Sequence, residues 1–336
     1  MCGVSVQTVS RVINGRPDVA PETRAAVEAA IAEMGFQPSA VARSLVQRRS
    51  RTLGLVAAGL KYFGVAQTLN GITEASEEAG YALLLKEVDA TGSDDILRVI
   101  EFLTAHRVEG IIFAAPDLGT GLAEIHADLP PGGPPIIFLK SEPSPDFITI
   151  LIDNRAGGRL ATEHLIASGR RRIAHLAGPL AWHEARDRRD GWLDALAAAG
   201  LTPGPEAEGN WSSASGAAGF EDLLAQDPTL DAVFVGNDQM ALGALSVAHA
   251  KGVPVPAAVA IVGFDGLDEG EHFTPSLTTV SQPLWELGQL AVTELLATIE
   301  GRADRRGGEP LTLAPTLVVR ASAPAVASSP VATGRR

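Results

Sequence analysis

Residues 4–24 read Val-Ser-Val-Gln-Thr-Val-Ser-Arg-Val-Ile-Asn-Gly-Arg-Pro-Asp-Val-Ala-Pro-Glu-Thr-Arg, and the rest of the chain is organised around this stretch. Ser5 can cap a helix, because its hydroxyl can accept a hydrogen bond from an amide of the first turn. An apolar stripe follows at helical spacing and consists of Val9, Val12 and Ile13. Asn14-Gly15 then supplies a stop signal. The pattern predicts a short helix that is buried on one side.

The other side of this helix carries side chains that suit the major groove of DNA. Gln7 can pair with adenine, Arg11 can pair with guanine, and the methyl groups of Val6 can contact thymine. A surface helix with ordinary polar residues would look the same on this stretch alone. The candidate DNA-contacting residues of the helix are Ser5, Val6, Gln7, Thr8, Arg11 and Asn14.

A second helix is expected directly afterwards. Pro21 suits the first turn of a helix, and Glu22 suits its positive end. Gly35 marks the end of this helix. Its apolar stripe consists of Val27, Ala30, Ile31 and Met34. Two such helices in succession are typical of a helix-turn-helix head.

Three runs of sequence carry a resemblance to a known family. They are Val-Ser-Val-Gln-Thr-Val-Ser-Arg-Val-Ile-Asn at 4–14, Pro-Glu-Thr-Arg at 21–24 and Pro-Ser-Ala-Val-Ala-Arg-Ser-Leu at 38–45. With these runs, residues 3–51 resemble the headpiece and hinge of the lactose-repressor family of bacterial transcription regulators. The resemblance implies that the hinge segment Pro38–Gln47 becomes helical on DNA. It also implies that Leu45 wedges into the central minor-groove step of the operator and kinks the duplex.

The head departs from the family pattern at its start. Family members carry the first helix of the motif before this point, whereas only Met1 and Cys2 precede Gly3 here. That helix crosses the DNA backbone and packs beneath the reading helix. We therefore expect residues 1–35 to be loosely packed or disordered, and the DNA affinity of this chain to be impaired.

Composition indicates a soluble protein with a substantial core. Apolar residues make up 46% of the 336 residues and charged residues 20%, and the formal net charge is −13. Residues 1–51 hold seven arginines against four acidic residues, so a basic head precedes an acidic body. The only cysteine, Cys2, excludes an internal disulfide framework. Without a long apolar run or a signal peptide, we expect no membrane span and a cytoplasmic location.

The body alternates strands and helices, which predicts parallel sheets covered by helices on both faces. The order restarts near residue 150, and several features recur at a nearly constant offset. The run at 53–58 is matched 120 positions later by the run at 173–178, and Gly71 and Gly80 recur as Gly191 and Gly200. The offset favours two similar doubly wound α/β lobes over one large sheet. Residues 52–322 thus resemble the effector-binding core of the same repressor family and, more distantly, the periplasmic sugar-binding proteins.

The domain boundaries follow from this repeat, because the chain is expected to cross between lobes near 150–153, 279–283 and 311–316. We predict a truncated helix-turn-helix head at 1–35 and a hinge segment at 36–51. The N-terminal lobe comprises 52–151 plus 283–311, and the C-terminal lobe comprises 152–282 plus 312–322. The tail, 323–336, is rich in Ala, Ser and Pro and is predicted to be disordered.

Ligands of such folds bind at the carboxyl ends of the strands. By the family's Arg-Xaa-Arg-Xaa-Xaa-Gly-Trp pattern, Arg188 is the ligand-binding arginine, and its fork suits vicinal hydroxyls, a carboxylate or a phosphate. Asn237 can cap a helix and present its amide to a ligand, while the neighbouring Asp238 is expected to be structural. Asp265 ends another strand and can accept hydrogen bonds from sugar hydroxyls. A turn aspartate satisfying its own backbone is the alternative at that position.

Apolar groups complete the predicted ligand site. Trp182 or Trp211 can stack on a sugar ring, and Tyr62 and Phe63 follow the first strand and could form an apolar wall. Leu284 matches a position where the family often has an aromatic residue, so its smaller side chain puts ring stacking there in doubt. A charged helix face exposed to solvent is the alternative reading of the segment around Arg188.

The sequence favours a regulator over an enzyme. It contains no Gly-Xaa-Ser-Xaa-Gly elbow, phosphate-binding loop or dinucleotide fingerprint, and its histidines lack metal-ligand spacing. We expect a homodimeric repressor that senses a small carbohydrate or glycoside between its lobes and binds a palindromic operator, with no enzyme activity and no cofactor. A purine or a sugar phosphate would also suit Arg188. The alternative function is a solute-binding protein with no DNA role, and operator binding by a chain with its first helix restored would separate the two.

Overall fold

The structure is a computed structural model that describes residues 3–13, 16–35, 49–88, 93–115, 129, 132–141, 143–302 and 308–325. The head contains α1 (Val6–Ile13) and α2 (Pro21–Glu33). The hydroxyl of Ser5 accepts a hydrogen bond from the amide of Thr8 at 3.2 Å, so Ser5 caps α1 as predicted. Asn14 and Leu45, and with Leu45 most of the hinge, lie outside the described residues.

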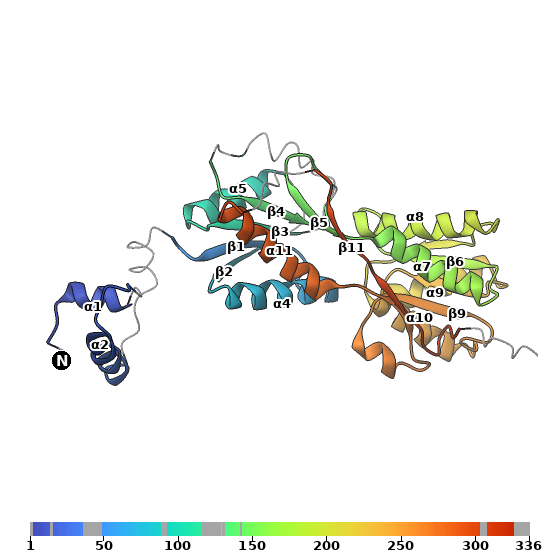
Figure 1. The fold of residues 1–336 in the computed structure, drawn as a ribbon. Helices are drawn as coiled ribbons and strands as arrows, with labels where there is room; N and C mark the ends of the chain where they lie inside the picture. Colours follow the sequence, from blue (N-terminus) through green and yellow to red (C-terminus); the bar gives the residue numbers. More distant parts are fainter. Residues whose placement is uncertain are drawn as a thin grey trace, which may run out of the picture.

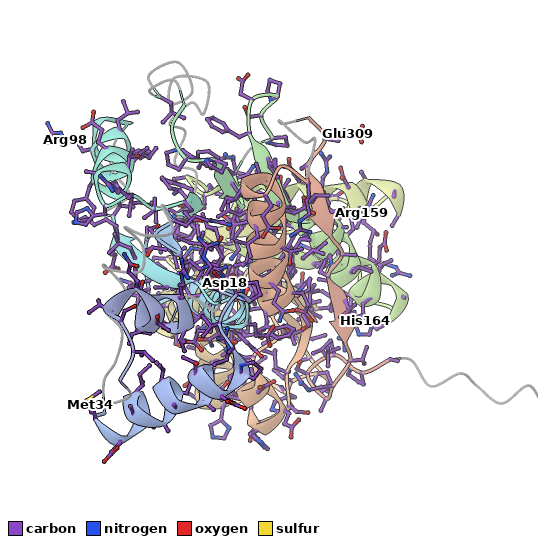
Figure 2. All side chains as sticks on the ribbon, turned by 60° about the vertical axis from the view of Figure 1, so that its left-hand side comes forward. Asp18, Met34, Arg98, Arg159, His164 and Glu309 are labelled. Atoms are coloured by element: carbon purple, nitrogen blue, oxygen red, sulfur yellow. The ribbon has the colours of Figure 1, made fainter. Side chains whose placement is uncertain are left out.

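The two helices of the head share a small apolar contact. Val12 on α1 is 5% exposed and Val27 on α2 is 1% exposed, as their places in the two stripes predict. Met34 does not follow its stripe, because it lies at the end of α2 and is 66% exposed (Figure 2). Gly35 follows with a φ of 58°, the left-handed conformation that favours glycine at the end of a helix.

The N-terminal lobe is a sheet in the order β11-β5-β4-β3-β1-β2, with parallel pairing throughout its described strands (Figure 1). Its central strands are continuous apolar runs that are buried on both faces, which is the pattern of parallel sheets. Its strands are β1 (Thr52–Ala57), β2 (Ala82–Glu87), β3 (Gly110–Ala114), β4 (Ile136–Leu139), β5 (Ile148–Ile152) and β11 (Leu311–Leu313). Its described helices are α4 (Phe63–Glu78), α5 (Ser93–Ala105) and α11 (Leu284–Ile299).

The C-terminal lobe repeats this plan with the sheet order β12-β10-β9-β8-β6-β7 (Figure 1). Its strands are β6 (Ile173–Ala177), β7 (Glu206–Glu208), β8 (Ala232–Val235), β9 (Ala260–Asp265), β10 (Thr278–Ser281) and β12 (Thr316–Val318). Its helices are α7 (Asn154–Ala167), α8 (His183–Ala198), α9 (Ser213–Gln226), α10 (Asp238–Ala250) and the 3-10 helix η1 (Asp268–His272). The short edge strand β12 pairs antiparallel with β10. The prediction of a wholly parallel sheet is therefore wrong for this lobe.

The described chain crosses between the lobes after β5, after β10 and between β11 and β12, near the predicted places. The last predicted boundary, 311/312, is two residues early, because β11 pairs with β5 through Leu313. Ala323, the first residue of the predicted disordered tail, is packed in the core of the C-terminal lobe. Ala323 is 1% exposed, and its carbonyl lies 2.7 Å from Nε2 of His164. His164 lies on α7 (Figure 2). Residues 326–336 lie outside the described residues.

The repeated glycines hold pairs of helices in close contact. A Cβ on Gly191 of α8 would collide with the backbone of Arg155 on α7, and one on Gly71 of α4 would collide with the backbone of Trp285 on α11. Equivalent glycines therefore serve the same packing role in the two lobes. In the C-terminal lobe this contact fixes the position of α8, which carries residues of the candidate site.

Candidate functional site

A cleft of about 470 Å³ lies between the carboxyl ends of the strands of both lobes. The N-terminal lobe contributes the start of α4 and the ends of β3 and β4. The C-terminal lobe contributes the starts of α8, α9 and α10 and the ends of β9 and β10. The lining residues are Lys61, Tyr62, Phe63, Gly64, Val65, Ala114, Lys140, Trp182, Glu184, Arg188, Asn210, Trp211, Ser212, Ser213, Asn237, Gln239, Asp265 and Gln282.

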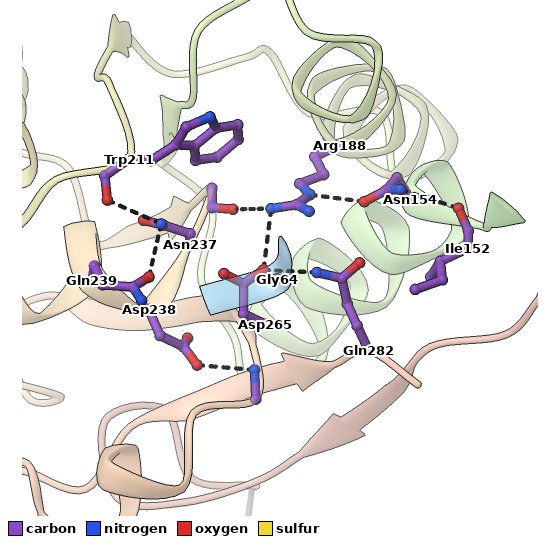
Figure 3. Close-up of polar contacts among 12 residues, drawn as sticks. Gly64, Ile152, Asn154, Arg188, Trp211, Asn237, Asp238, Gln239, Asp265 and Gln282 are labelled. Carbon is purple, nitrogen blue, oxygen red and sulfur yellow. Dashed lines mark hydrogen bonds and ion pairs between the residues drawn. The ribbon is translucent and has the colours of Figure 1, made fainter. Parts of the chain in front are cut away.

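Arg188 is the central cation of the C-terminal wall and is only 6% exposed. Its Nε donates to the side-chain oxygen of Asn154 at 2.8 Å, and its Nη1 donates to the carbonyl of Gly236 at 2.5 Å (Figure 3). The guanidinium also lies over the rings of Phe264, at 3.9 Å, and Trp211, at 5.3 Å. Burial lowers the pKa of Arg188, and nearby carboxylates, Asp265 first, oppose that shift. These contacts hold the fork in place before any ligand binds.

Asp265 faces Arg188 across 3.5 Å and accepts a hydrogen bond from Nε2 of Gln282 at 2.7 Å (Figure 3). Burial raises the pKa of Asp265, while Arg188 and Lys140 lower it. Its φ of 114° lies in the left-handed region, a strained position for a residue other than glycine. The carboxylate of Asp265 lines the cleft, where its partners are Arg188 and Gln282. It is therefore not the turn aspartate that bonds its own backbone. Sequence placed Asp265 and Arg188 in one site, and the structure brings them together.

Asn237 lies on the same wall, but its amide is already engaged. Its oxygen accepts from the amide of Met240 at 2.9 Å and caps α10. Its Nδ2 donates to the carbonyl of Trp211 at 3.1 Å and to the side chain of Gln239 at 2.9 Å. Asn237 therefore lines the cleft mainly as an organiser of its neighbours.

The neighbouring Asp238 is structural, as its position at the start of α10 predicted. Its carboxylate accepts hydrogen bonds from the amides of Gly266 and Leu267, at 3.0 Å and 2.8 Å, and from the hydroxyl of Thr279 at 2.7 Å. Burial raises the pKa of Asp238 to about 8, Asp265 adds to the shift, and these hydrogen bonds oppose it. The contacts fasten the turn that follows β9 and so position Asp265.

Aromatic rings form the apolar part of the cleft. Tyr62, from the N-terminal lobe, meets Trp182 edge to face at 5.5 Å between ring centroids. Trp182 in turn meets Trp211 at 5.8 Å, and Phe63 also lines the cleft. The predicted aromatic residues are thus brought together from both lobes. The indole Nε1 of Trp211 is buried without a hydrogen-bond partner.

Leu284 is the predicted site residue that the structure does not place on the cleft. It is 3% exposed and packs in the core of the N-terminal lobe at the start of α11. A smaller aliphatic side chain at this position does not reach the cavity.

Sequence reasoning missed Lys140, Gln282, Asn154 and Glu184. Lys140 and Gln282 come directly after β4 and β10. The rule that ligands bind beyond the carboxyl ends of strands could have marked both. Glu184 lies in the first turn of α8, where an acidic residue is favoured by the helix dipole whatever its function.

The predicted DNA-contacting side of α1 is open to solvent. Val6 is 86% exposed, Gln7 and Arg11 are exposed, and Thr8 is half-buried. Arg11 makes only a loose ion pair with Asp18, at 3.7 Å. This face can therefore meet a partner without unfolding the head.

Two further observations apply to the described part of the chain. It has no group of three or more His, Cys, Asp or Glu side chains that could hold a metal ion. None of its helices is long and apolar enough to cross a membrane.

Known proteins share both parts of this arrangement. A family model for bacterial regulatory proteins of the lacI family matches residues 1–39, and a model for a periplasmic binding protein-like domain matches residues 162–323. The lactose operon repressor of Escherichia coli (strain K12) is 34% identical over 301 residues, which cover 90% of this chain and 83% of the repressor. The crystal structure of the lac repressor dimer bound to operator and the anti-inducer ONPF matches with a TM-score of 0.88 at 33% identity, over 96% of this chain and 97% of that one. The complex of the transcriptional regulator CelR with cellobiose matches with a TM-score of 0.73 at 33% identity and the same coverage. This chain therefore belongs to the LacI family of bacterial regulatory proteins and is a transcription regulator with a ligand-binding core.

Proposed function

We propose that this protein is a repressor that binds a small carbohydrate or glycoside in the cleft between its lobes and thereby changes its affinity for operator DNA. The observation that carries the proposal is the composition of the cleft. A preorganised Arg188–Asp265 pair lies beside aromatic rings that come from both lobes. Charged groups can hydrogen-bond sugar hydroxyls, and aromatic faces can cover the apolar faces of a sugar ring.

The coupling to DNA follows from the position of the cleft. A ligand that contacts both walls stabilises one relative position of the lobes, and only a difference in its affinity for two positions can shift their populations. The lac repressor structure contains a dimer, an operator and an anti-inducer. We infer the same assembly here, with two copies of α1 reading the two halves of a palindromic site.

The residues assigned to each role remain those of the sequence argument, except that Leu284 is removed from the ligand site; Asn14 and Leu45, which lie outside the described residues, stay proposed DNA contacts. Arg188, Asp265, Trp211, Trp182, Tyr62 and Phe63 are proposed to contact the ligand, and Asn237 to position its neighbours. Gln7, Thr8, Arg11 and Val6 are proposed to contact bases, with Ser5 as the cap. Because a DNA-bound regulator works where the chromosome is, we propose a cytoplasmic location.

Enzyme activity is not part of the proposal. The relatives named above are regulators. Two charged groups of the cleft, Arg188 and Asp265, are paired with each other, and Asp265 also accepts a hydrogen bond from Gln282. Such an arrangement is suited to holding a polar ligand.

A thermal-shift screen against neutral mono- and disaccharides tests the ligand class. A sugar present at ~100 times its Kd should add roughly 2.7 kcal/mol of stability and raise the Tm. Gel-shift assays would then measure the DNA affinity of this chain, and of the same chain extended at its N-terminus by the first head helix of the family, on duplexes selected from a random pool. The proposal would be contradicted if no sugar in the screen raised the Tm. It would also be contradicted if the head-extended chain selected no palindromic duplex from the random pool.

A further inference from the structure

Two charged side chains face the cleft from opposite lobes and are not paired with each other. Lys140 follows β4 of the N-terminal lobe, and Glu184 lies in the first turn of α8 of the C-terminal lobe. Both line the cavity. Neither belongs to the Arg188–Asp265 pair described above.

Glu184 carries an unsatisfied oxygen. The side chain is only 7% exposed, and its Oε2 is buried without a hydrogen-bond partner. A buried carboxylate oxygen without a donor is costly, because it has lost its water and gained nothing in return. The neighbouring carboxylate of Asp187, by contrast, has a partner in His183 at 3.2 Å.

Lys140 is also poorly satisfied. Its Nζ donates a long hydrogen bond of 3.4 Å to the carbonyl of Gly64 on the same lobe. Burial lowers the pKa of Lys140, and the carboxylates of Glu184 and Asp265 oppose this shift from the other wall. Its φ of 57° lies in the left-handed region, so the backbone holds Lys140 in a strained conformation at the edge of the cavity.

We propose that Lys140 and Glu184 together bind one hydroxyl group of an uncharged ligand and so bridge the two lobes. The hydroxyl donates a hydrogen bond to the free oxygen of Glu184 and accepts a hydrogen bond from the ammonium group of Lys140. This inference rests on the proposed sugar-binding function and narrows it. It selects a neutral polyhydroxy compound, such as an unmodified disaccharide, over a phosphorylated sugar or another anion.

The charge balance of the cavity supports the selection. In its interior the buried Arg188 and the half-buried Lys140 are matched by the buried carboxylates of Glu184 and Asp265, whereas a third cation, Lys61, is exposed to solvent. A neutral ligand leaves this balance intact. An anionic ligand would add a third negative charge close to two buried carboxylates, where like charges repel strongly.

The pair also explains how a ligand can act on both lobes. Contacts to Arg188 and Asp265 alone would fix a sugar to the C-terminal lobe. A hydroxyl that is shared between Lys140 and Glu184 ties it to the N-terminal lobe as well. The bound state therefore favours one separation of the two walls.

The experiment compares Lys140→Met, Glu184→Gln and the double variant with the unmodified chain. The probes are cellobiose, lactose, maltose and trehalose, each alongside its 6-phosphate, with affinities measured by calorimetry. Each single substitution should weaken the binding of the neutral sugar about tenfold to a hundredfold, the usual effect of removing a hydrogen bond to a charged group. The double variant should lose less than the product of the two single effects, because the residues share one hydroxyl.

An exposed pair supplies the matched control. Lys251 and Glu221 form a surface ion pair at 3.0 Å, away from the cleft. Lys251→Met and Glu221→Gln should leave sugar affinity unchanged. The Tm of the sugar-free chain distinguishes a ligand-binding role of Glu184 from a purely structural one. Glu184→Gln should leave the Tm of the sugar-free chain unchanged or raise it, since it removes a buried negative charge whose Oε2 has no donor.

The outcomes are distinct. Neutral sugars that bind with unchanged affinity to Lys140→Met and Glu184→Gln would overturn the inference and leave the proposed function intact. A 6-phosphate that binds more tightly than its neutral partner, or a Glu184→Gln chain of clearly lower Tm, would also overturn it. If neither the neutral nor the phosphorylated sugars bind the unmodified chain, the proposed sugar-sensing function itself fails.

Discussion

Single side chains in the cleft serve the fold as well as the ligand. Arg188 bonds Asn154 and Gly236, faces Asp265 and lies over Phe264, all without a ligand. The sequence pattern identifies Arg188 only as a ligand-binding residue. The contacts show that removing it would also leave a buried carboxylate unpaired.

Arg188→Met tests this double role. We expect it to abolish sugar binding and to destabilise the C-terminal lobe by about 3 to 5 kcal/mol, the usual cost of removing one partner from a buried ion pair. Adding Asp265→Asn should recover part of the stability, because the unpaired carboxylate is gone, but it should not restore binding. Calorimetry and urea denaturation measure the two effects. Retention of full sugar affinity by Arg188→Met would exclude it from the site.

His175 on β6 gives the fold a defined pH dependence. Burial lowers its pKa from 6.5 to about 3, with a further lowering by Arg189 and Arg188, against a hydrogen bond to the carbonyl of Phe234 at 2.9 Å. Below pH 6.5 the unfolded chain gains a proton at this position, whereas the folded chain does not until about pH 3. The stability that the neutral ring contributes is therefore present above pH 6.5 and is lost as the pH falls toward 3.

His175→Asn should remove this dependence. Its amide nitrogen can take over the hydrogen bond to Phe234, and it does not titrate. Between pH 6.5 and 5 the free energy of unfolding of the unmodified chain should fall relative to the variant by up to about 1.4 kcal/mol per pH unit. The raised pKa of Asp238 makes the free energy of unfolding increase as the pH falls over this range. Both chains contain Asp238, so its contribution cancels in their difference. Urea denaturation followed by tryptophan fluorescence measures the difference, and parallel pH profiles would show that His175 does not titrate as described.

Helices and strands were the most predictable part of the molecule. Continuous apolar runs such as 53–57 and 232–235 identify buried parallel strands, since both of their faces are covered. The antiparallel strand β12 was not predicted, because a three-residue edge strand carries almost no pattern. Lys140 and Glu184 were missed for a different reason. The place of Lys140 directly after β4 could have marked it as a candidate, but the roles proposed for the two residues depend on which groups face them from the other lobe, and those groups lie far away in the sequence.

Close helix packing makes Gly191 a sensitive position in the C-terminal lobe. Gly191→Ala would push a Cβ into the backbone of Arg155, so α8 must move away from α7. We expect a loss of about 1 to 3 kcal/mol in the free energy of unfolding, the usual cost of overpacking, together with weaker sugar binding because α8 carries Arg188 and Glu184. Gly64→Ala is the matched control for stability only, because Gly64 lines the cleft. Its Cβ would meet only ordinary contacts at 3.7 and 3.8 Å, and its stability should be equal or slightly higher. Equal stability of the Gly191→Ala chain and the unmodified chain would show that the two helices can separate without cost.

The two lobes and the head together account for regulation. The lobes are joined only by the crossings after β5, after β10 and between β11 and β12 in the described chain, so their relative position can change while each core stays intact. Residues 49–51 connect the hinge to the N-terminal lobe, and there Arg49 and the amide of Arg51 bond the carboxylate of Glu109, both at 2.7 Å. We therefore expect a movement of that lobe to displace residues 49–51 with it.

The most direct test of this account titrates a sugar that binds the cleft into the complex of the head-extended chain with its selected palindromic duplex. DNA affinity is followed by fluorescence anisotropy, with Arg188→Met as the control. The account predicts that the sugar changes the DNA affinity of the unmodified chain by about fivefold or more, in the range usual for coupled sites, and leaves that of Arg188→Met unchanged. A sugar that saturates the cleft while the DNA affinity stays constant would contradict it.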